Sequence, residues 1–481
     1  MAPSRVTAQL TKKGAPGVLM AALFAACALY FYAPVASIFT SLSPGYNEGW
    51  NALHTARLVN GQQLYPPISE LIQNNYPPVS FYVVAAVSRL TDGDALIAGR
   101  LVAIVSLLII AGAIGVASAH AMKSRGMGVV AALSILAIIG GQYQVYVAYD
   151  DPQLLAHAFM ACGVATLFCA PLRRRSVILA SLLMLLGGFT KHMLLPAPLA
   201  VTVWLFIVDK RLFRVWIAAS ISFACVAFIA CYALYGVEFF SSVLGYKRSL
   251  SLGRFLIGAG GLSPLLPIIL VGAVPIAGKK LTASPAQFFS IAMIFGVAIS
   301  LLARSGAGVD VNAYFDIVIY GVPAALAGVQ QIVASTRDTR AAIASGVLLG
   351  LLAISPAFTP APIRLPGLFE WRKAHADLAK ASKEVIEGLR AIEGPVACEQ
   401  LSYCYWAGKS FDFDIFNVDQ ASRANSEVRD LVEAKMADGA FAAIQLEPDW
   451  RAAPFLVNDA IAASYAPIRD YPNGVVIVAP K

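Results

Sequence analysis

The sequence predicts a polytopic α-helical membrane protein that ends in a small soluble α/β domain. Hydrophobic residues make up 58% of its 481 residues and charged residues only 13%, against roughly 45–50% and about 25% in an ordinary globular chain. The charge is also divided along the chain. Residues 1–359 contain 23 basic and 11 acidic residues, whereas residues 360–481 contain 13 basic and 17 acidic residues. The first three-quarters is therefore apolar with few, mostly basic charges, and the last quarter has the composition of a soluble domain.

This composition excludes several classes of protein. A soluble enzyme, a disordered chain and a small disulfide-stapled protein would not contain such long apolar runs, and the strands of a transmembrane β-barrel would alternate. The positive charge is not a nucleic-acid footprint, because the basic residues occur in short clusters between apolar runs. We therefore expect membrane lipids, and no nucleic acid, among the partners of the chain.

Eleven apolar runs are candidates for membrane-crossing helices, each of which needs about 20 residues. They are residues 17–40, 98–119, 128–146, 153–172, 176–190, 193–208, 215–236, 255–277, 285–303, 314–334 and 341–358. The first run is too long for a signal peptide, so we expect an uncleaved anchor that follows a cytoplasmic tail of residues 1–16. The stretch 76–90 is short and opens with two prolines, which favours a re-entrant or interfacial helix over a full crossing.

Basic clusters between the runs predict the orientation, because loops rich in Lys and Arg stay in the cytoplasm. If the eleven runs alternate, six clusters fall on one side: Lys12/Lys13, Lys123/Arg125, Arg173–Arg175, Lys210/Arg211/Arg214, Lys279/Lys280 and Arg337/Arg340. The opposite side then holds nine of the eleven acids that precede residue 360. An odd number of crossings places residues 360–481 on that same outer side, after a transmembrane domain of residues 17–359.

The C-terminal part is typical of an α/β domain. A charged helix is expected over 370–392, a second helix over 421–435, and short strands at 395–398, 441–445 and 474–478. Cys398 and Cys404 lie in this outer domain, where a disulfide between them is compatible with the compartment. Their spacing does not establish that disulfide. A zinc site would need two further ligands that the sequence does not supply.

The first outer loop, residues 41–75, carries the earliest candidate site. Glu48 follows the first run, next to Asn47, and Tyr65 and Tyr76 come before the stretch that opens with prolines. Glu48 is a candidate for the acid of a site in this loop, and Asn47, Tyr65 and Tyr76 are candidates for a substrate cleft. The alternative is an amphipathic interfacial helix with aromatic anchors and a solvated glutamate.

Two further constellations lie at outer span ends. Adjacent carboxylates at a membrane boundary, Asp150 and Asp151, are costly unless they are paired, hydrated or bound to a cation. Asp151 could instead cap the helix that begins at Pro152. The pair Lys191 and His192 departs from the positive-inside pattern and could hold an anionic lipid head group, or Lys191 could extend its ammonium to the interface.

A late outer loop runs from Arg304 into a span and contains Asn312 and Tyr314, which we expect in the substrate cleft unless the loop is an ordinary turn. Arg248 and Arg254, in another outer loop, are candidate phosphate contacts. Taken together, carboxylates and cations gather at one membrane face. A carboxylate there can act as general base on a sugar hydroxyl, while cations or a metal offset charge on a departing phosphate.

The order of these motifs resembles the GT-C glycosyltransferases over residues 40–335. The shared features are an acidic first loop, Gly61-x-x-x-Tyr65, Tyr76-Pro77-Pro78, Arg100-Leu101, Asp151-Pro152, Gly188-x-x-Lys191 and Asn312-x-Tyr314-Phe315. The chain is most similar to the bacterial branch of protein-mannosyltransferase-like and aminoarabinose- or galacturonosyl-transferase-like enzymes. The resemblance implies a bacterial inner-membrane enzyme with a periplasmic active site. It implies inverting transfer of a hexose or pentose from a polyprenyl-phosphate donor to a hydroxyl of a glycan, lipid or protein.

The resemblance also implies roles for particular residues. Glu48 maps to the general base, Asp150 or Asp151 to the second acidic site, and Lys191 to the partner of the lipid phosphate. The family often has two acids where this sequence has Asn47-Glu48, which places metal binding by the first loop in doubt. If a divalent cation such as Mg²⁺ or Mn²⁺ is used, Glu48 and Asp151 are its candidate ligands.

Two alternatives remain at this point. A secondary transporter or lipid-linked glycan flippase would explain the spans, but it would place its binding residues near the midplane on broken helices, often in inverted repeats. The sequence shows no such repeat. The other alternative is a non-catalytic protein of the same fold. It remains open because Asn47 stands where the family often has a second acid.

Overall fold

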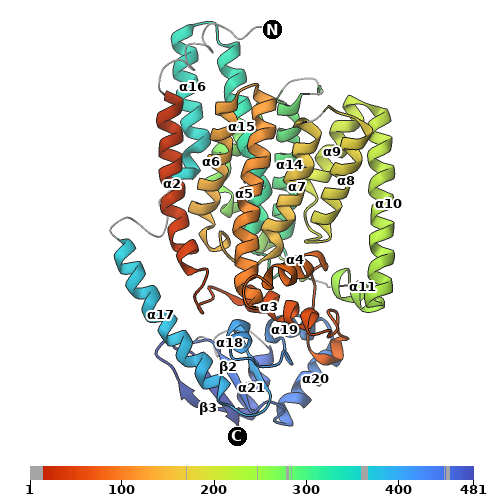
Figure 1. Cartoon of the computed structure of the whole chain (residues 1–481), viewed down its shortest axis with the longest axis vertical. Coiled ribbons are helices and arrows are strands. Elements are labelled where there is room, and N and C mark those ends of the chain that lie inside the picture. Colours follow the sequence, from red (N-terminus) through yellow and green to blue (C-terminus); the bar gives the residue numbers. More distant parts are fainter. Residues whose placement is uncertain are drawn as a thin grey trace.

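The structure is a computed structural model that describes residues 15–169, 171–245, 248–277, 281–282, 284–358, 367–448, 450 and 456–481. The expected cytoplasmic tail lies outside these residues except for its last two, and so do Lys279 and Lys280 of one basic cluster. Figure 1 shows a bundle of long helices standing side by side above a smaller α/β domain.

Each of the eleven apolar runs coincides with helix. The bundle consists of α2 (Ala15–Ser37), α5 (Ala95–Met122), α6 (Arg125–Gln142), α7 (Pro152–Cys169), α8 (Arg174–Gly188), α9 (Pro196–Val208), α10 (Lys210–Tyr235), α12 (Leu252–Gly261) with α13 (Leu266–Gly272), α14 (Pro285–Arg304), α15 (Phe315–Ser335) and α16 (Thr339–Ile354). Nine segments of the described chain are long and apolar enough to cross a membrane, with α12 and α13 counted as one. Helices α8 and α9 have 15 and 13 residues and are shorter.

Small residues set the close packing of the bundle. A Cβ atom added to Gly128 of α6 would lie 2.5 Å from the carbonyl oxygen of Gly115 on α5, so these helices approach backbone to backbone. Helix α15 is the most enclosed, with every residue from Phe315 to Val329 buried. Because lipid gives no hydrophobic driving force between helices, such close contact is what holds them together.

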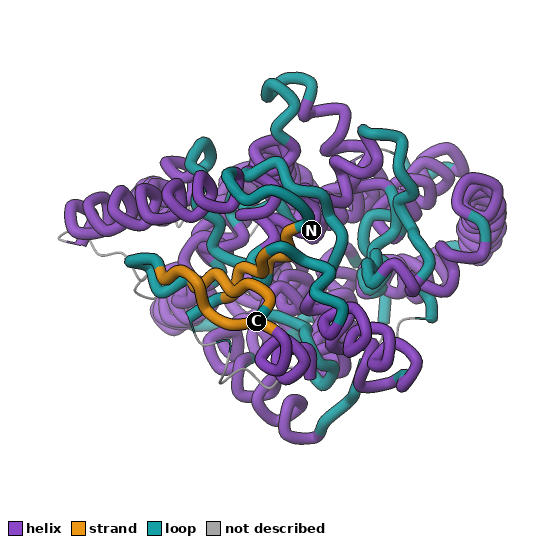
Figure 2. The backbone as a smooth tube through the Cα atoms, turned by 90° about the horizontal axis from the view of Figure 1, so that it is seen from below, coloured by secondary structure: helices purple, strands orange, loops and turns teal. Residues whose placement is uncertain are grey.

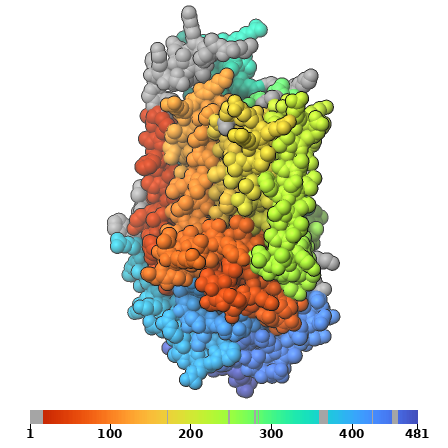
Figure 3. All heavy atoms as spheres, turned by 45° about the vertical axis from the view of Figure 1, so that its right-hand side comes forward, coloured from red at the N-terminus to blue at the C-terminus, as the bar shows by residue number. Residues whose placement is uncertain are grey.

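A layer of short helices separates the bundle from the C-terminal domain, as Figure 3 shows in orange and red. It contains α3 (Tyr46–Val59), η1 (Ile68–Glu70) and α4 (Val79–Ser88), with α11 (Val237–Val243) beside them. Helix α4 has 10 residues and is therefore about 15 Å long, half of a hydrocarbon core of about 30 Å. It is too short to cross, in agreement with a re-entrant or interfacial helix.

The C-terminal domain contains a four-stranded sheet of order β1-β2-β4-β3, seen from below in Figure 2. Strands β1 (Val396–Cys398) and β2 (Ala443–Leu446) are parallel, and β4 (Val476–Pro480) pairs antiparallel with both β2 and β3 (Tyr465–Asp470). Its helices are α17 (Gly367–Arg390), α18 (Leu401–Trp406), α19 (Ile415–Ala424), α20 (Ser426–Ala437) and α21 (Leu456–Ser464).

The domain differs from expectation in two places. Strand β3 was not predicted, because it is an edge strand whose last four residues are exposed and show no apolar alternation. The single helix expected over 421–435 is two helices, because Asn425 has extended backbone and its side chain caps α20 by accepting from the amide of Glu427.

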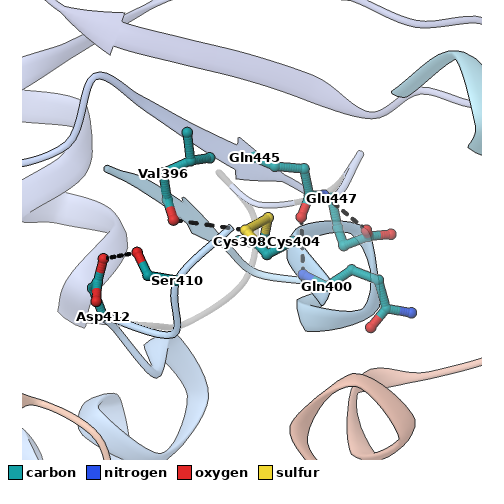
Figure 4. Close-up of a disulfide and its surroundings, with 8 residues drawn as sticks. All are labelled: Val396, Cys398, Gln400, Cys404, Ser410, Asp412, Gln445 and Glu447. Carbon is teal, nitrogen blue, oxygen red and sulfur yellow. Dashed lines mark hydrogen bonds between the residues drawn. A yellow bond between two sulfur atoms is a disulfide. The ribbon is translucent and has the colours of Figure 1, made fainter. Parts of the chain in front are cut away.

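A disulfide joins Cys398 at the end of β1 to Cys404 on α18, as Figure 4 shows. The amide of Gln400, between the two cysteines, donates to the side chain of Gln445 on β2 at 3.0 Å. The short segment between the strand and α18 is thus held to the sheet by both a covalent and a polar link.

Candidate functional site

The C-terminal domain docks on α3 through the buried Asp414. Its carboxylate accepts hydrogen bonds from the indole Nε1 of Trp50 at 3.0 Å, from the hydroxyl of Tyr46, and from Asn417. Burial raises the pKa of Asp414, while these hydrogen bonds to the charged form oppose the rise. Because Asp414 also caps α19 through the amide of Asn417, the same residue places α19 against the first outer loop.

Glu48 lies in a closed ion pair. Its two oxygens accept from Nε and Nη2 of Arg100 at 2.8 and 2.7 Å, and neither side chain is exposed beyond 2%. The remaining guanidinium donors bond to backbone carbonyls of residues 37–42. Both oxygens of the carboxylate are therefore occupied by the guanidinium in a bidentate pair, and the side chain is sealed from solvent. The placement does not support the general-base role expected of Glu48, and it makes Glu48 a structural junction between α3 and α5.

Asp150 is buried beside that junction. Its amide donates to Glu48 at 3.2 Å, and its carboxyl group fills the space that a side chain on Gly99 would need. Burial, with the charges of Glu48 and Asp151, raises the pKa of Asp150 well above its usual range. Asp150 is therefore tightly packed beside the Glu48–Arg100 pair.

Asp151, the next residue, connects the junction to a cation. Its Oδ1 accepts from Nζ of Lys191 at 3.2 Å, and its Oδ2 accepts from Asn47 at 3.3 Å. It also caps α7 by accepting from the amide of Gln153 at 2.8 Å. Asp151 therefore has the helix-capping role that the sequence offered as an alternative, in addition to its contact with Lys191. Burial, the largest single effect, would lower the pKa of Lys191, but the charge of Asp151 acts together with Tyr76 and with hydrogen bonds to both residues, and the pKa is raised. Lys191, which also lies over the ring of Tyr76 at 4.9 Å, therefore keeps its charge.

A cavity of about 440 Å³ opens at this point, between the bundle, the first outer loop and the C-terminal domain. Its polar wall comes from seven segments of the chain and its other wall is apolar. The polar and aromatic lining includes Tyr46, Asn47, Trp50, Asn75, Tyr76, Gln153, Lys191, His192, Arg248, Asp310, Asn312, Asp316, Phe416 and Asn417. The apolar lining includes Val243, Leu250, Ile299 and Leu302.

Three of the four residues expected at a phosphate lie at the cavity: Lys191, His192 and Arg248. Arg248 also donates to the carbonyl of Ala307 at 2.7 Å, which holds its guanidinium at the cavity edge. Arg254 is not part of the lining. Its guanidinium donates to the carbonyls of Ser249 and Ser305 and joins two loops instead.

Of the five residues expected in the substrate cleft, three line the cavity and two lie behind its wall. Asn47, Tyr76 and Asn312 line the cavity. Tyr65 lies behind the wall, where its hydroxyl donates to the carbonyl of Tyr76 at 2.8 Å. Tyr314 is also behind the wall and donates to the carbonyl of Gly258 at 2.7 Å. These two tyrosines support the cavity and do not face it.

Several lining residues were not predicted as site residues. Asp310 and Asp316 are two of the nine acids that the sequence places on the outer side. Their position beside Asn312 could have identified them as site residues. Gln153 likewise follows the Asp151-Pro152 step. Nothing in the sequence pointed to Phe416 and Asn417, which reach the cavity from the C-terminal domain.

The arrangement does not fit the divalent cation expected at Glu48 and Asp151. Both oxygens of Glu48 are taken by Arg100, and Asp151 is paired with Lys191. The described residues also contain no cluster of three or more His, Cys, Asp or Glu side chains that could hold a metal ion.

The sequence matches no protein-family model and no curated protein. The fold is similar to that of ArnT from Cupriavidus metallidurans, solved in the apo state and bound to undecaprenyl phosphate. Each of these structures has 16% identity and a TM-score of 0.56, over 94% of this chain and 97% of ArnT. An Archaeoglobus fulgidus oligosaccharyltransferase in its apo form has 12% identity and a TM-score of 0.49, over 96% of this chain and 75% of the other. At the level of the fold, the GT-C membrane architecture expected from the ordered motifs is confirmed.

Proposed function

We propose that the protein transfers a sugar from a polyprenyl-phosphate donor to a hydroxyl of an envelope glycan, lipid or protein. The observation that carries this proposal is the cavity, in which the buried cation Lys191 and Arg248 share a lining with carboxylates and amides. The similar fold of ArnT, one structure of which is bound to undecaprenyl phosphate, supports a lipid phosphate as the ligand.

Lys191 is the proposed partner of the phosphate, with Arg248 beside it. Asp151 holds the ammonium in place at 3.2 Å and keeps it charged, so it needs little reorganisation when the phosphate arrives. Preorganised charge of this kind stabilises charge that develops in a transition state. The apolar lining at Leu250 and Leu302 suits the first isoprene units of the donor.

The proposed reaction is a single displacement with inversion. The acceptor oxygen forms a bond to the anomeric carbon as the bond from that carbon to the phosphate oxygen breaks. The electron pair stays on the phosphate, whose charge Lys191 and Arg248 offset. Phe416 and Asn417 lie on the wall contributed by the C-terminal domain, and we assign the acceptor to that side. The proposed location is a bacterial inner membrane, with the cavity on the periplasmic face.

The test uses a deletion strain of the source organism, analysed by mass spectrometry of envelope glycans and polyprenyl-phosphate sugars. Deletion should remove one sugar from an acceptor and cause its lipid-linked donor to accumulate, and the wild-type gene should reverse both changes. Lys191→Gln should fail to do so and should bind undecaprenyl phosphate at least about 10-fold more weakly, because a charge-assisted hydrogen bond contributes ~1.5–3 kcal/mol.

Lys210→Gln is the matched control, since Lys210 begins α10 and lies outside the cavity lining. It should behave as wild type. A deletion strain with unchanged glycans and unchanged donor levels would refute sugar transfer. Because loss of a flippase would also leave the acceptor unmodified, failure of the purified protein to transfer sugar to the acceptor in membranes of the deletion strain would favour a flippase instead.

A further inference from the structure

The carboxylates around the cavity differ in how fully they are engaged. Glu48 is sealed by Arg100, and Asp151 accepts from Lys191, Asn47 and the amide of Gln153. Asp310 accepts from the hydroxyl of Tyr146 at 2.7 Å, lies 3.9 Å from Arg304, and its side chain is 62% exposed. Each of these carboxylates is thus paired with a cation, hydrogen-bonded or open to solvent.

Asp316 is different. It is the second residue of α15, it lines the cavity, and its side chain is only 8% exposed. Within the described residues the one basic side chain whose nitrogen lies within 4.0 Å of its carboxylate is His157, with Nδ1 3.8 Å from Oδ1 of Asp316. Helix α14 leaves little room behind it, because a Cβ on Gly296 would lie 3.2 Å from the Cβ of Asp316.

The hydrogen bonds of Gln153 determine which nitrogen of His157 carries the proton. The side-chain nitrogen of Gln153 donates to the backbone carbonyl of Asn312 at 3.3 Å, which identifies that atom as the amide nitrogen. The same nitrogen lies 2.9 Å from Nε2 of His157 and must donate to it. A neutral imidazole that accepts at Nε2 carries its proton on Nδ1, which is the atom nearest Asp316 and has no hydrogen-bond partner of its own among the described residues.

We propose that Asp316 is the general base of the transfer reaction and that His157 positions it; this inference rests on the proposed function. As the acceptor oxygen bonds to the anomeric carbon, its proton moves to a carboxylate oxygen of Asp316. The bond between the anomeric carbon and the phosphate oxygen breaks and leaves polyprenyl phosphate. In the proposed mechanism the Nδ1–H of His157, which lies 3.8 Å from Oδ1 in this substrate-free structure, donates to that oxygen when substrate binds and leaves Oδ2 for the acceptor proton. Catalytic contacts of about this length in a substrate-free site commonly tighten when substrate binds.

The experiment mixes purified variants with membranes of the deletion strain, which hold the accumulated donor and the unmodified acceptor. Asp316→Asn should lower the transfer rate by about 10²–10⁴-fold, the usual contribution of general-base catalysis. Its binding of undecaprenyl phosphate should stay within about 3-fold of wild type, because Lys191 is untouched. Glu238→Gln, an acid on α11 outside the cavity lining, should transfer at the wild-type rate.

Three further measurements separate chemistry from folding. Sodium formate should partly restore transfer by Asp316→Ala, because a small carboxylate can occupy the vacated space. His157→Gln should lower kcat more than it changes KM. The double variant His157→Gln/Asp316→Asn should be no slower than Asp316→Asn alone, since residues that act as a unit are not additive.

The proposal and its premise fail in different ways. If wild-type protein transfers no sugar to these membranes, the proposed function itself is wrong. If wild type transfers but Asp316→Asn is equally active, or Asp310→Asn alone abolishes transfer, Asp316 is not the base. Additive effects of the two substitutions, or no rescue by formate, would also overturn the assignment.

Discussion

At the scale of single residues, neighbouring carboxylates take different roles because of the groups that surround them. Asp150 and Asp151 are adjacent in the chain, yet Asp151 meets Lys191 at 3.2 Å and Asp150 is packed against Gly99. The two adjacent side chains therefore have different neighbours. The sequence therefore identified this pair as unusual, and only the packing distinguishes the member that reaches the site.

The buried pair of Glu48 and Arg100 leads to a stability prediction. Glu48→Gln leaves the guanidinium of Arg100 buried without a counter-charge, and breaking such a pair typically costs about 3–5 kcal/mol. We expect a large fall in the melting temperature in detergent. The matched control is Glu70→Gln, because Glu70 forms a 3.3 Å pair with Arg57 but is 45% exposed, where such pairs contribute less than about 1 kcal/mol. Equal stability of both variants would contradict the structural role of Glu48.

Asp150 leads to a pH-dependent prediction. Its folded-state pKa is raised above the usual 3.8 by burial and by the charges of Glu48 and Asp151. Below pH 4 both the folded and the unfolded forms are protonated, so there is no penalty. As the pH rises, only the unfolded form ionises, and the folded protein loses stability by up to about 1.4 kcal/mol per pH unit.

Asp150→Asn should therefore raise the melting temperature at pH 7 and have little effect near pH 4. Transfer activity should be retained, because Asp150 lies outside the cavity lining. Asp430→Asn, an exposed carboxylate on α20, is the control and should show no such pH dependence. A pH-independent effect of Asp150→Asn would mean that the carboxyl is ionised in the folded protein. Loss of transfer activity in this variant would instead support the catalytic role that the sequence analysis expected of Asp150.

At the scale of elements, the contact between α3 and α18 governs how the C-terminal domain meets the first outer loop. A Cβ on Gly49 of α3 would lie 2.0 Å from the backbone nitrogen of Ser402 on α18. The hydroxyl of Tyr405, also on α18, accepts from the first amide of α5 at 2.7 Å. The disulfide fixes α18 to the sheet. The close contact between Gly49 and α18 therefore determines where the C-terminal domain lies relative to the site.

Gly49→Ala should therefore loosen the docking of the domain, because backbone atoms cannot move aside as a flexible side chain can. Overpacking of this kind costs about 1–3 kcal/mol, and we expect faster release of a fragment containing residues 367–481 in limited proteolysis. Gly112→Ala is the control. A Cβ at that position meets no heavy atom within 4 Å, so it should leave the digestion unchanged. Identical digestion of both variants would show that the contact is not required for docking.

At the scale of the whole molecule, the C-terminal domain and the helices α3 and α4 of the first outer loop lie at one end of the bundle (Figure 1). The basic clusters predict that this end is the periplasmic one. A reporter phosphatase that folds only in the periplasm should be active when fused after Lys481. The same reporter fused after Lys210, at a cytoplasmic cluster, should be inactive. Activity of the second fusion and inactivity of the first would reverse the orientation of every span.

The sequence by itself determined the membrane architecture. Each membrane helix must satisfy its own backbone hydrogen bonds, so its length and apolar character are local properties, and all eleven runs coincide with helix. The order of short motifs also identified the fold that the comparison with ArnT confirms, and it placed Lys191, Asn47, Tyr76 and Asn312 at what proves to be one cavity.

Only the tertiary structure decided which acids face that cavity. Trp50 and Asp414 are 364 residues apart and hydrogen-bonded, and the same docking brings Phe416 and Asn417 to the lining. Glu48 has the local context of a catalytic acid, but Arg100 from another helix closes it off, whereas Asp316 is left facing the cavity beside His157. The reactivity of a carboxylate depends on its partners and its burial, and here both come from segments distant in the chain.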